Sequence, residues 1–151
     1  MAPAARPRIL LSRLTAAQLG ARLLAAAQPG GVDLVALEDV ADDDRQTVDA
    51  VFISRDITGL ASKSQPSEAL ARCYRVIRRS PGLRWVHTHS AGADRPIYGE
   101  LMARGVAVST SSGANARIVA HTALAGVLAL ARRLPPLWAA QAERRWASLA
   151  R

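Results

Sequence analysis

The sequence of 151 residues is poor in several residue types that usually mark a function. It has one lysine, Lys63, one cysteine, Cys73, and an aromatic content of only 4%. A single cysteine cannot form an internal disulfide, so we expect a protein of a reducing compartment, the cytoplasm. Few aromatic side chains leave little surface on which the bases of single-stranded nucleic acid could stack.

The basic residues do not gather into a patch. The formal net charge is +8 and the isoelectric point about 11.3, but the arginines are scattered along the chain and no run of five cations occurs. Such a distribution is typical of a solvated surface. We therefore expect no nucleic-acid partner.

Long hydrophobic runs are also missing. The longest apolar stretch without a charged residue, Ile118 to Ala131, is shorter than the roughly 20 residues that span a bilayer. The first eight residues contain two prolines and two arginines and lack the apolar core of a signal peptide. We expect no membrane partner.

The usual fingerprints of catalysis and cofactor binding are absent. The sequence contains no G-x-G-x-x-G and no G-x-x-x-x-G-K-[ST], so it assigns no cofactor-binding residue. Residues 88–92 are similar to a nucleophile elbow, but Thr88 replaces its first glycine. His87, His89 and His121 lack a spacing that distinguishes a metal site. We predict no catalytic residue and no metal ligand in this chain.

Short apolar runs alternate with helical segments over residues 1–113. This alternation predicts a parallel sheet covered on both faces, and five strands with four connections favour a flavodoxin-like α/β domain. Residues 57–65 are expected to form a loop and residues 39–44 an acidic, solvated connection. The expected strands are 8–11, 32–37, 48–54, 83–88 and 106–109, and the expected helices are 15–28, 66–79 and 96–104.

Polar residues near the helix starts predict three helix caps. Thr15 with Gln18 matches a capping box, Asp94 precedes a helix that has Pro96 in its first turn, and Asn115 precedes the next helix. Side chains of these types accept hydrogen bonds from the first free N–H groups of a helix.

Residues 114–151 differ in character from the first domain. A long helix over 118–133 is apolar on almost every side, so we expect it to be buried against a core or another subunit. Pro135 and Pro136 are expected to break it, and residues 137–146 form a short basic helix. We interpret residues 114–151 as interdomain or dimerisation helices.

Two loops at the ends of predicted strands could bind a small anion. The loop of residues 90–94 follows the fourth strand, and Gly92 would let its backbone approach a ligand closely. The loop of residues 110–115 follows the fifth strand, and Asn115 either points into the same crevice or only caps the helix. Arg55 follows the third strand, where a bidentate guanidinium could hold a carboxylate or form a surface ion pair with Asp56.

Several stretches together resemble one family. Residues 83–94 (LRWVHTHSAGAD) and 98–106 (YGELMARGV) are similar to the substrate loop of the D-isomer-specific 2-hydroxyacid dehydrogenases and its continuation. Residues 112–115 (SGAN) and 118–125 (IVAHTALA) resemble the family's motif at the start of the helix that joins its two domains. The sequence departs from the family at His121-Thr122, where many members have Glu-His after Val-Ala.

The resemblance implies an NAD-dependent oxidoreductase that interconverts 2-hydroxy and 2-oxo acids as a homodimer. It implies that the amides of Ala91 and Gly92, flanked by Ser90, bind the substrate carboxylate, that Asn115 faces the cleft and that Arg55 adds a carboxylate ligand. The family's NAD-binding Rossmann domain, with its catalytic arginine, glutamate and histidine, would follow residue 146 and is missing from the 151 residues. We therefore expect a fragment that neither binds NAD nor turns over substrate alone. The alternative is a non-enzymatic module that dimerises through the apolar helix 118–133 or binds a small anion.

Overall fold

The computed structural model describes residues 5–41, 48–62 and 65–148. They form two compact units, the first ending at Ser111 and the second beginning at Ser112. Each unit is described by itself below.

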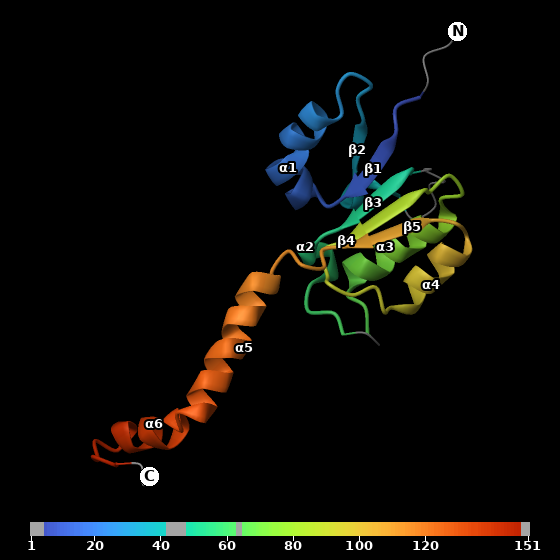
Figure 1. The fold of residues 1–151 in the computed structure, drawn as a ribbon. Helices are drawn as coiled ribbons and strands as arrows, with labels where there is room; N and C mark the ends of the chain where they lie inside the picture. The colour runs from blue at the N-terminus through green and yellow to red at the C-terminus, as the bar shows by residue number, and fades with distance from the viewer. Residues whose placement is uncertain (1–4, 42–47, 63–64, 149–151) are drawn as a thin grey trace. The chain divides into compact units, whose positions relative to one another are not determined.

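A five-stranded parallel sheet forms the centre of the first unit (Figure 1). Its strands stand in the order β2-β1-β3-β4-β5, and all four neighbouring pairs are parallel. This confirms the predicted α/β class with a five-stranded parallel sheet. The strands are β1 (Arg8–Leu11), β2 (Asp33–Ala36), β3 (Ala50–Ile53), β4 (Trp85–Thr88) and β5 (Ala107–Thr110).

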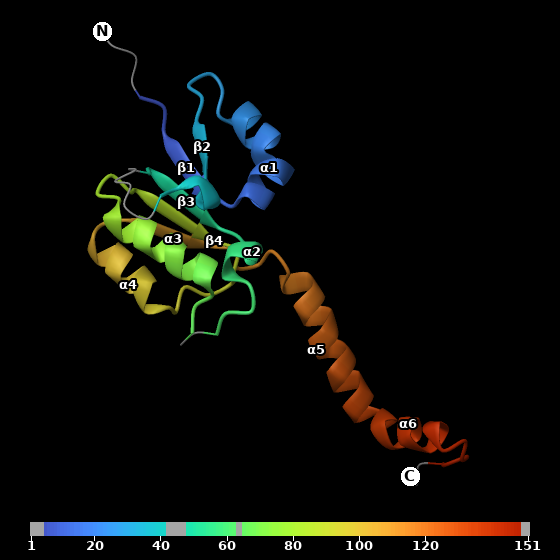
Figure 2. The ribbon, with the colours of Figure 1, turned by 180° about the vertical axis from the view of Figure 1, so that it is seen from behind.

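Helices cover both faces of this sheet, as Figures 1 and 2 show. Helices α3 (Glu68–Arg79) and α4 (Pro96–Ala103) lie on one face, and α1 (Arg13–Ala26) lies on the other. The α3 side holds the main core because α3 repeats apolar residues at helical spacing. This core includes Leu10, Val51, Ile53, Leu70, Cys73, Ile77, Val86, Tyr98 and Leu101.

Two of the three predicted caps are corrected. Helix α1 begins at Arg13 and is capped by Ser12, whose Oγ accepts a hydrogen bond from the N–H of Thr15 at 3.0 Å. Thr15 therefore lies inside the first turn, because β1 ends one residue before Ser12 and the chain turns there. Arg95 occupies the cap position of α4 in place of Asp94 and makes no side-chain cap bond. Asn115 is at the cap position of α5, but its side chain makes no cap bond either.

The predicted connections are more ordered than expected. A short helix, α2 (Arg55–Thr58), begins directly after the expected strand 48–54 and takes the first two residues of the expected loop 57–65, and it ends at Gly59 with φ +58°. A 3-10 turn, η1 (Leu37–Asp39), takes the last residue of the expected strand 32–37 and the first residue of the acidic connection 39–44, and its Leu37 is buried. Residues 42–44 of that connection lie outside the described residues.

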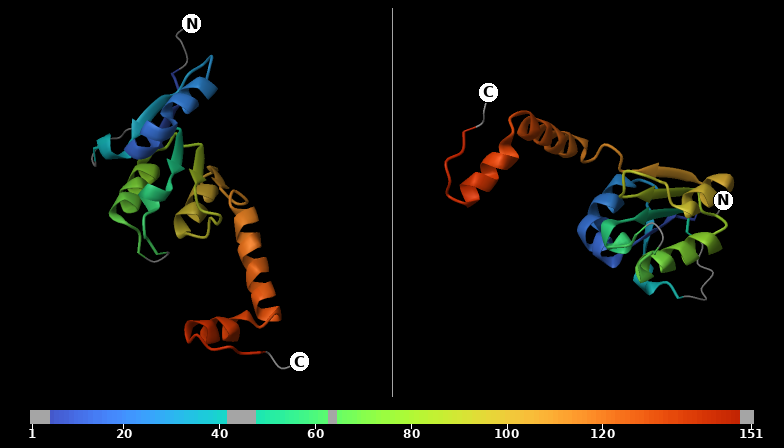
Figure 3. Two further views of the ribbon diagram at one scale, coloured as in Figure 1. Left: turned by 90° about the vertical axis from the view of Figure 1, so that its left-hand side faces the viewer. Right: turned by 90° about the horizontal axis from the view of Figure 1, so that it is seen from below.

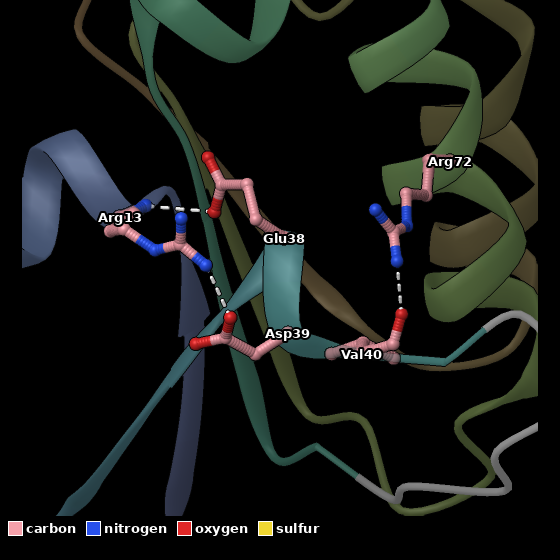
Figure 4. Close-up of polar contacts among 5 residues, drawn as sticks. All are labelled: Arg13, Glu38, Asp39, Val40 and Arg72. Carbon is pink, nitrogen blue, oxygen red and sulfur yellow. Dashed lines mark hydrogen bonds and ion pairs between the residues drawn. The ribbon is translucent and has the colours of Figure 1, made fainter.

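Figure 4 shows how η1 is held. The backbone N–H of Arg13 donates to Glu38 Oε2 at 2.9 Å, and the Arg13 guanidinium pairs with Asp39. On the other side, the Arg72 guanidinium from α3 donates to the backbone carbonyl of Val40. The turn after β2 is thus tied to both α1 and α3.

The second unit consists of α5 (Ala116–Ala131) and α6 (Leu134–Ala142), which Figure 3 shows from two sides. The predicted break at the two prolines is wrong in position. Arg133 breaks the helix with a left-handed φ of 51°, and Pro135 and Pro136 lie in the first turn of α6, which their fixed φ favours. No single described helix is long and apolar enough to cross a bilayer; only α5 and α6 together, across a 79° bend, meet that test.

The apolar side chains of α5 are exposed in the chain as described. None of the sixteen residues of α5 is buried. The side chains that a partner would have to cover are Ile118, Val119, Leu124, Val127, Leu128 and Leu130, which are 54–71% exposed.

Candidate functional site

The carboxyl edge of the sheet gathers polar residues around the point where the strand order reverses. In the order β2-β1-β3-β4-β5 the reversal lies between β1 and β3, the position at which open parallel sheets bind ligands. Ser12 follows β1 and Ser54 follows β3, and their hydroxyl oxygens are 3.4 Å apart. The Ser12 hydroxyl also donates to Thr15 Oγ1 at 2.9 Å, and all three side chains are buried.

Asp56 in α2 completes this hydroxyl cluster. Burial raises its pKa, but hydrogen bonding with the hydroxyl cluster of Ser12, Ser54 and Thr15 and with its own backbone N–H outweighs burial and holds the pKa below its ordinary value. The carboxylate is therefore ionised at neutral pH.

The edge beside β2 and α3 is acidic. A pocket of about 240 Å³ brings together Glu38, Asp56 and Glu68 with one cation, Arg72. Three carboxylates around one pocket repel a negatively charged ligand, so they oppose the binding of an anion in this pocket. A small anion is therefore better placed at the other half of the edge, beside β3 and β4.

The loop of residues 90–94, which follows β4, is anchored to the carboxyl edge of the sheet by its first residue, Ser90. Ser90 Oγ lies 2.8 Å from Thr88 Oγ1, and the Ser90 carbonyl accepts a hydrogen bond from the N–H of Ser111 at 3.1 Å. Thr88 is fully buried, so the anchor is part of the core. These bonds fix the loop against the ends of β4 and β5.

The next two residues, Ala91 and Gly92, present free backbone donors. Both residues are exposed, and neither N–H group has a hydrogen-bond partner in the described part of the chain. Consecutive free N–H groups near a helix start are suited to bind a carboxylate or phosphate. Gly92 has no left-handed φ, and a Cβ added to it would meet nothing closer than Asp94 Oδ1 at 3.8 Å, so the fold itself does not require glycine here.

Arg55 is exposed at the first position of α2. It lines an open pocket of about 420 Å³ together with Leu14 and Gln18 of α1. Its guanidinium is also close enough to His89 to affect the pKa of that ring. Arg55 thus lies at the carboxyl edge of the sheet, next to the first turns of α1 and near His89.

His89 is the residue that the sequence analysis missed as a member of this site. Burial lowers the pKa of His89, the Arg55 guanidinium lowers it further, and the Asp56 carboxylate raises it by less. The ring is therefore neutral at neutral pH. The available signal in the sequence was its place directly after a strand, next to the loop that the resemblance identifies.

The other predicted residues have different surroundings. Asn115 lies in the second unit, so its predicted place in the cleft stays a prediction. His87 is held by two hydroxyls, with Nδ1 2.9 Å from Ser109 Oγ and Nε2 3.1 Å from Ser111 Oγ. Over the described ranges, no group of three His, Cys, Asp or Glu side chains is placed to hold a metal ion.

Comparison with known proteins gives a likeness of fold. No protein-family model matches the sequence, and no curated protein matches it. A solved D-isomer-specific 2-hydroxyacid dehydrogenase of Xanthobacter autotrophicus Py2, in complex with NADPH and MES, matches 97% of this chain at 24% identity and a TM-score of 0.57. A D-lactate dehydrogenase of Aquifex aeolicus, complexed with NAD and lactic acid, matches 95% at 13% identity and a TM-score of 0.57.

A further solved structure is an NAD-dependent formate dehydrogenase of Staphylococcus aureus in complex with NAD, with 16% identity, 95% of this chain covered and a TM-score of 0.51. The chain spans only 39–42% of the length of these three proteins. The resemblance to the D-isomer-specific 2-hydroxyacid dehydrogenases is thus confirmed at the level of fold.

Proposed function

We propose that this chain is the substrate-binding part of an NAD-dependent oxidoreductase that interconverts 2-hydroxy and 2-oxo acids. The observation that carries the proposal is the pair of N–H groups of the exposed residues Ala91 and Gly92, which have no hydrogen-bond partner among the described residues and stand on a loop anchored to the core. The likeness in fold to dehydrogenases of such acids supports the choice of ligand.

In this proposal the chain binds and orients the acid. The two amides donate to the substrate carboxylate, and Arg55 adds a positive charge from the neighbouring strand end. A carboxylate held by charged and neutral donors is fixed in direction as well as in place, which orients the carbon that carries the oxygen. The acidic pocket with Glu38, Asp56 and Glu68 opposes binding on the far side of the edge.

The residues of this chain do not fit a dinucleotide. The turn from β1 into α1 is Leu11-Ser12-Arg13, with no glycine to let a pyrophosphate approach, and the sequence has no Rossmann fingerprint. We assign NAD to a separate nucleotide-binding unit of the complete enzyme, and we expect this chain alone to be inactive. A single, fully buried cysteine is consistent with a cytoplasmic setting.

Substrate binding is tested on the full 151-residue chain by ¹H–¹⁵N NMR with glyoxylate or pyruvate as the probe. We expect the Ala91 and Gly92 amide signals to shift with a Kd in the millimolar range, and sodium chloride at equal ionic strength to leave them in place. Unchanged amide signals at saturating probe would contradict the proposal.

A matched pair of variants tests the role of Arg55. Arg55→Gln should weaken glyoxylate binding about tenfold, because a charge-assisted hydrogen bond contributes about 1.5–3 kcal/mol and this one is exposed. Arg84→Gln makes the same change of charge directly before β4, at the amino end of the strand, where Arg84 is 3.7 Å from Asp49. This variant should leave binding unchanged. Equal effects of the two variants would mean that only net charge matters.

A second candidate function is self-association through α5. The exposed apolar side chains of this helix favour it, since contiguous apolar surface marks an interaction site or an aggregation hazard. We propose a homodimer, measured by size exclusion with light scattering. Val127→Arg should give a monomer, whereas Met102→Arg, at a similarly exposed position of α4, should not. A wild-type monomer, or aggregate without a defined mass, would refute the dimer.

A further inference from the structure

Two segments leave the sheet side by side at the carboxyl ends of β3 and β4. The last paired residues of these strands are Ile53 and Thr88, and the N–H of the next residue, His89, donates to the Ile53 carbonyl at 2.9 Å. Neighbouring strands are about 4.8 Å apart. Segment 54–62 follows β3 and segment 89–95 follows β4, so the two segments start as neighbours.

Arg95 joins the far ends of the two segments. Its Nη1 atom donates a hydrogen bond to the carbonyl of Ser62 at 2.7 Å, and its Nη2 atom donates to the carbonyl of Ala61 at 3.3 Å. Arg95 is half-buried. A planar guanidinium has its N–H donors in a fixed fork and can hold two neighbouring carbonyls at once, whereas the ammonium of a lysine is a compact point charge. The segments are therefore paired at the sheet and clamped again at Arg95.

One segment carries Arg55 on α2. The N–H of Gly59 donates to the carbonyl of Arg55 at 2.7 Å, which closes the helix. The N–H of Ala61 then donates to the carbonyl of Thr58 at 3.2 Å. Because these short-range bonds tie Ala61 to α2, the contact of Arg95 with the Ala61 carbonyl also restrains the helix that carries Arg55.

The other segment carries the amides of Ala91 and Gly92. Its start is held by Ser90, whose Oγ lies 2.8 Å from the Oγ1 of buried Thr88. Its end is held by Arg95, which stands three residues after Gly92 at the cap position of α4. The two amides, which have no hydrogen-bond partner among the described residues, thus stand between two anchors, and the second anchor reaches the neighbouring segment.

We propose that Arg95 is a positioning residue, which holds the Arg55 guanidinium and the two amides at the spacing that lets them bind one carboxylate together. The inference rests on the proposed function and adds to it a residue that does not touch the ligand. A carboxylate is small and hydrogen bonds weaken steeply when their geometry is distorted, so donors on two segments serve one ligand only while the segments keep their spacing. The effect of Arg95 on binding therefore depends on Arg55 and disappears when the Arg55 guanidinium is removed.

Glyoxylate titrations of the full 151-residue chain, followed by the Ala91 and Gly92 amide signals, test this. Arg95→Gln should weaken binding about fivefold, less than the loss of about tenfold expected for Arg55→Gln, because its effect passes through Arg55. Arg104→Gln is the matched control, because Arg104 makes the same kind of bond at the other end of α4, where its Nη2 donates to the Ser80 carbonyl at 3.0 Å. This variant removes the same charge and should leave binding unchanged.

A double-mutant cycle separates positioning from a general loss of structure. In the Arg55→Gln background, adding Arg95→Gln should weaken binding further by less than about twofold, because the spacing no longer matters. A residue that only stabilises the fold or adds charge would weaken binding by the same factor in both backgrounds. Arg95→Lys keeps the charge but not the fork, so it should weaken binding about threefold, again only while Arg55 is present. Should Arg95→Gln fail to fold, Arg95→Lys decides by the same comparison.

The outcomes distinguish this inference from the function on which it rests. Wild-type amides that do not shift with glyoxylate would refute both. Shifted amides, with Arg95→Gln equal to Arg104→Gln or equally weakening in both backgrounds, would refute the role of Arg95 and leave the proposed function standing. Shifted amides, with a loss in Arg95→Gln that disappears without the Arg55 guanidinium, would support both.

Discussion

Replacing Ser12 by alanine tests the hydroxyl cluster at the strand-order reversal. The Ser12 Oγ caps α1 by accepting from the Thr15 N–H at 3.0 Å, and it donates to Thr15 Oγ1 at 2.9 Å. Loss of such a cap costs about 1 kcal/mol. A buried hydroxyl that loses a partner adds about 1–3 kcal/mol, at the low end here because Thr15 also bonds Asp56. We expect Ser12→Ala to lower the free energy of unfolding by about 2 kcal/mol.

Urea denaturation followed by circular dichroism measures this change. Ser67→Ala is the control for a cap outside the cluster. Ser67 caps α3 by accepting from the Leu70 N–H at 3.2 Å and donates to the Ile57 carbonyl at 2.8 Å, but it is only half-buried, so water can replace its bonds and the variant should lose about 1 kcal/mol. Thr122→Ala, at an exposed position in the middle of α5, should change the free energy of unfolding by less than about 0.5 kcal/mol.

The same variant has a second, independent readout. Ser12 belongs to the hydroxyl cluster that lowers the pKa of Asp56, so Ser12→Ala should move that pKa back towards the ordinary value, as measured by the carboxyl ¹³C shift. A loss of stability no larger than that of Ser67→Ala, together with an unchanged pKa of Asp56, would refute the reasoning about the cluster.

Three further predictions concern the hydrophobic core, the loss of stability at low pH and the reactivity of the Cys73 thiol. Leu101→Ala should cost about 2–5 kcal/mol of unfolding free energy because Leu101 is fully buried, whereas Leu124→Ala on exposed α5 should cost less than about 0.5; equal losses in chemical denaturation would contradict the assigned core. The lowered pKa of Asp56 means that its carboxylate stabilises the fold above the ordinary carboxyl pKa and that this contribution is lost as the pH falls through the folded-state pKa. Asp56→Asn should therefore flatten the acid limb of the stability–pH profile, and an unchanged limb would count against the assignment. Burial raises the pKa of Cys73 to about 12, so an aromatic disulfide reagent should label it only after denaturation; rapid labelling of folded protein would show that it is accessible.

Much of the fold was predictable because its signals are local. Apolar runs such as Val51 to Ile53 give strands, and the spacing of Leu70, Cys73 and Ile77 gives the buried face of α3. The Ser67 cap of α3 could also be predicted locally, because a serine stands directly before the first residue of the helix. The Thr15 cap was wrong because α1 begins almost directly after β1, so Ser12, the first residue beyond the strand, takes the cap position. The Asp94 cap was wrong by one residue, since Arg95 stands at the cap position of α4.

The features of the site also divide into those that local sequence patterns predict and those that depend on tertiary contacts. The sequence by itself determined the parallel α/β class, the loop Ser90–Gly92 at a strand end and the apolar character of α5, because each follows from the order and spacing of residue types. The tertiary structure alone decided that Ser12 forms one cluster with Ser54 and Asp56, which lie 42 and 44 residues further along the chain, and that Arg55 lies near enough to the ring of His89 to lower its pKa. It also decided that the Nε2 atom of His89 is buried without a hydrogen-bond partner among the described residues, whereas that of His87 lies 3.1 Å from Ser111 Oγ. Such facts depend on which strands are neighbours and in what register, and no local pattern encodes that.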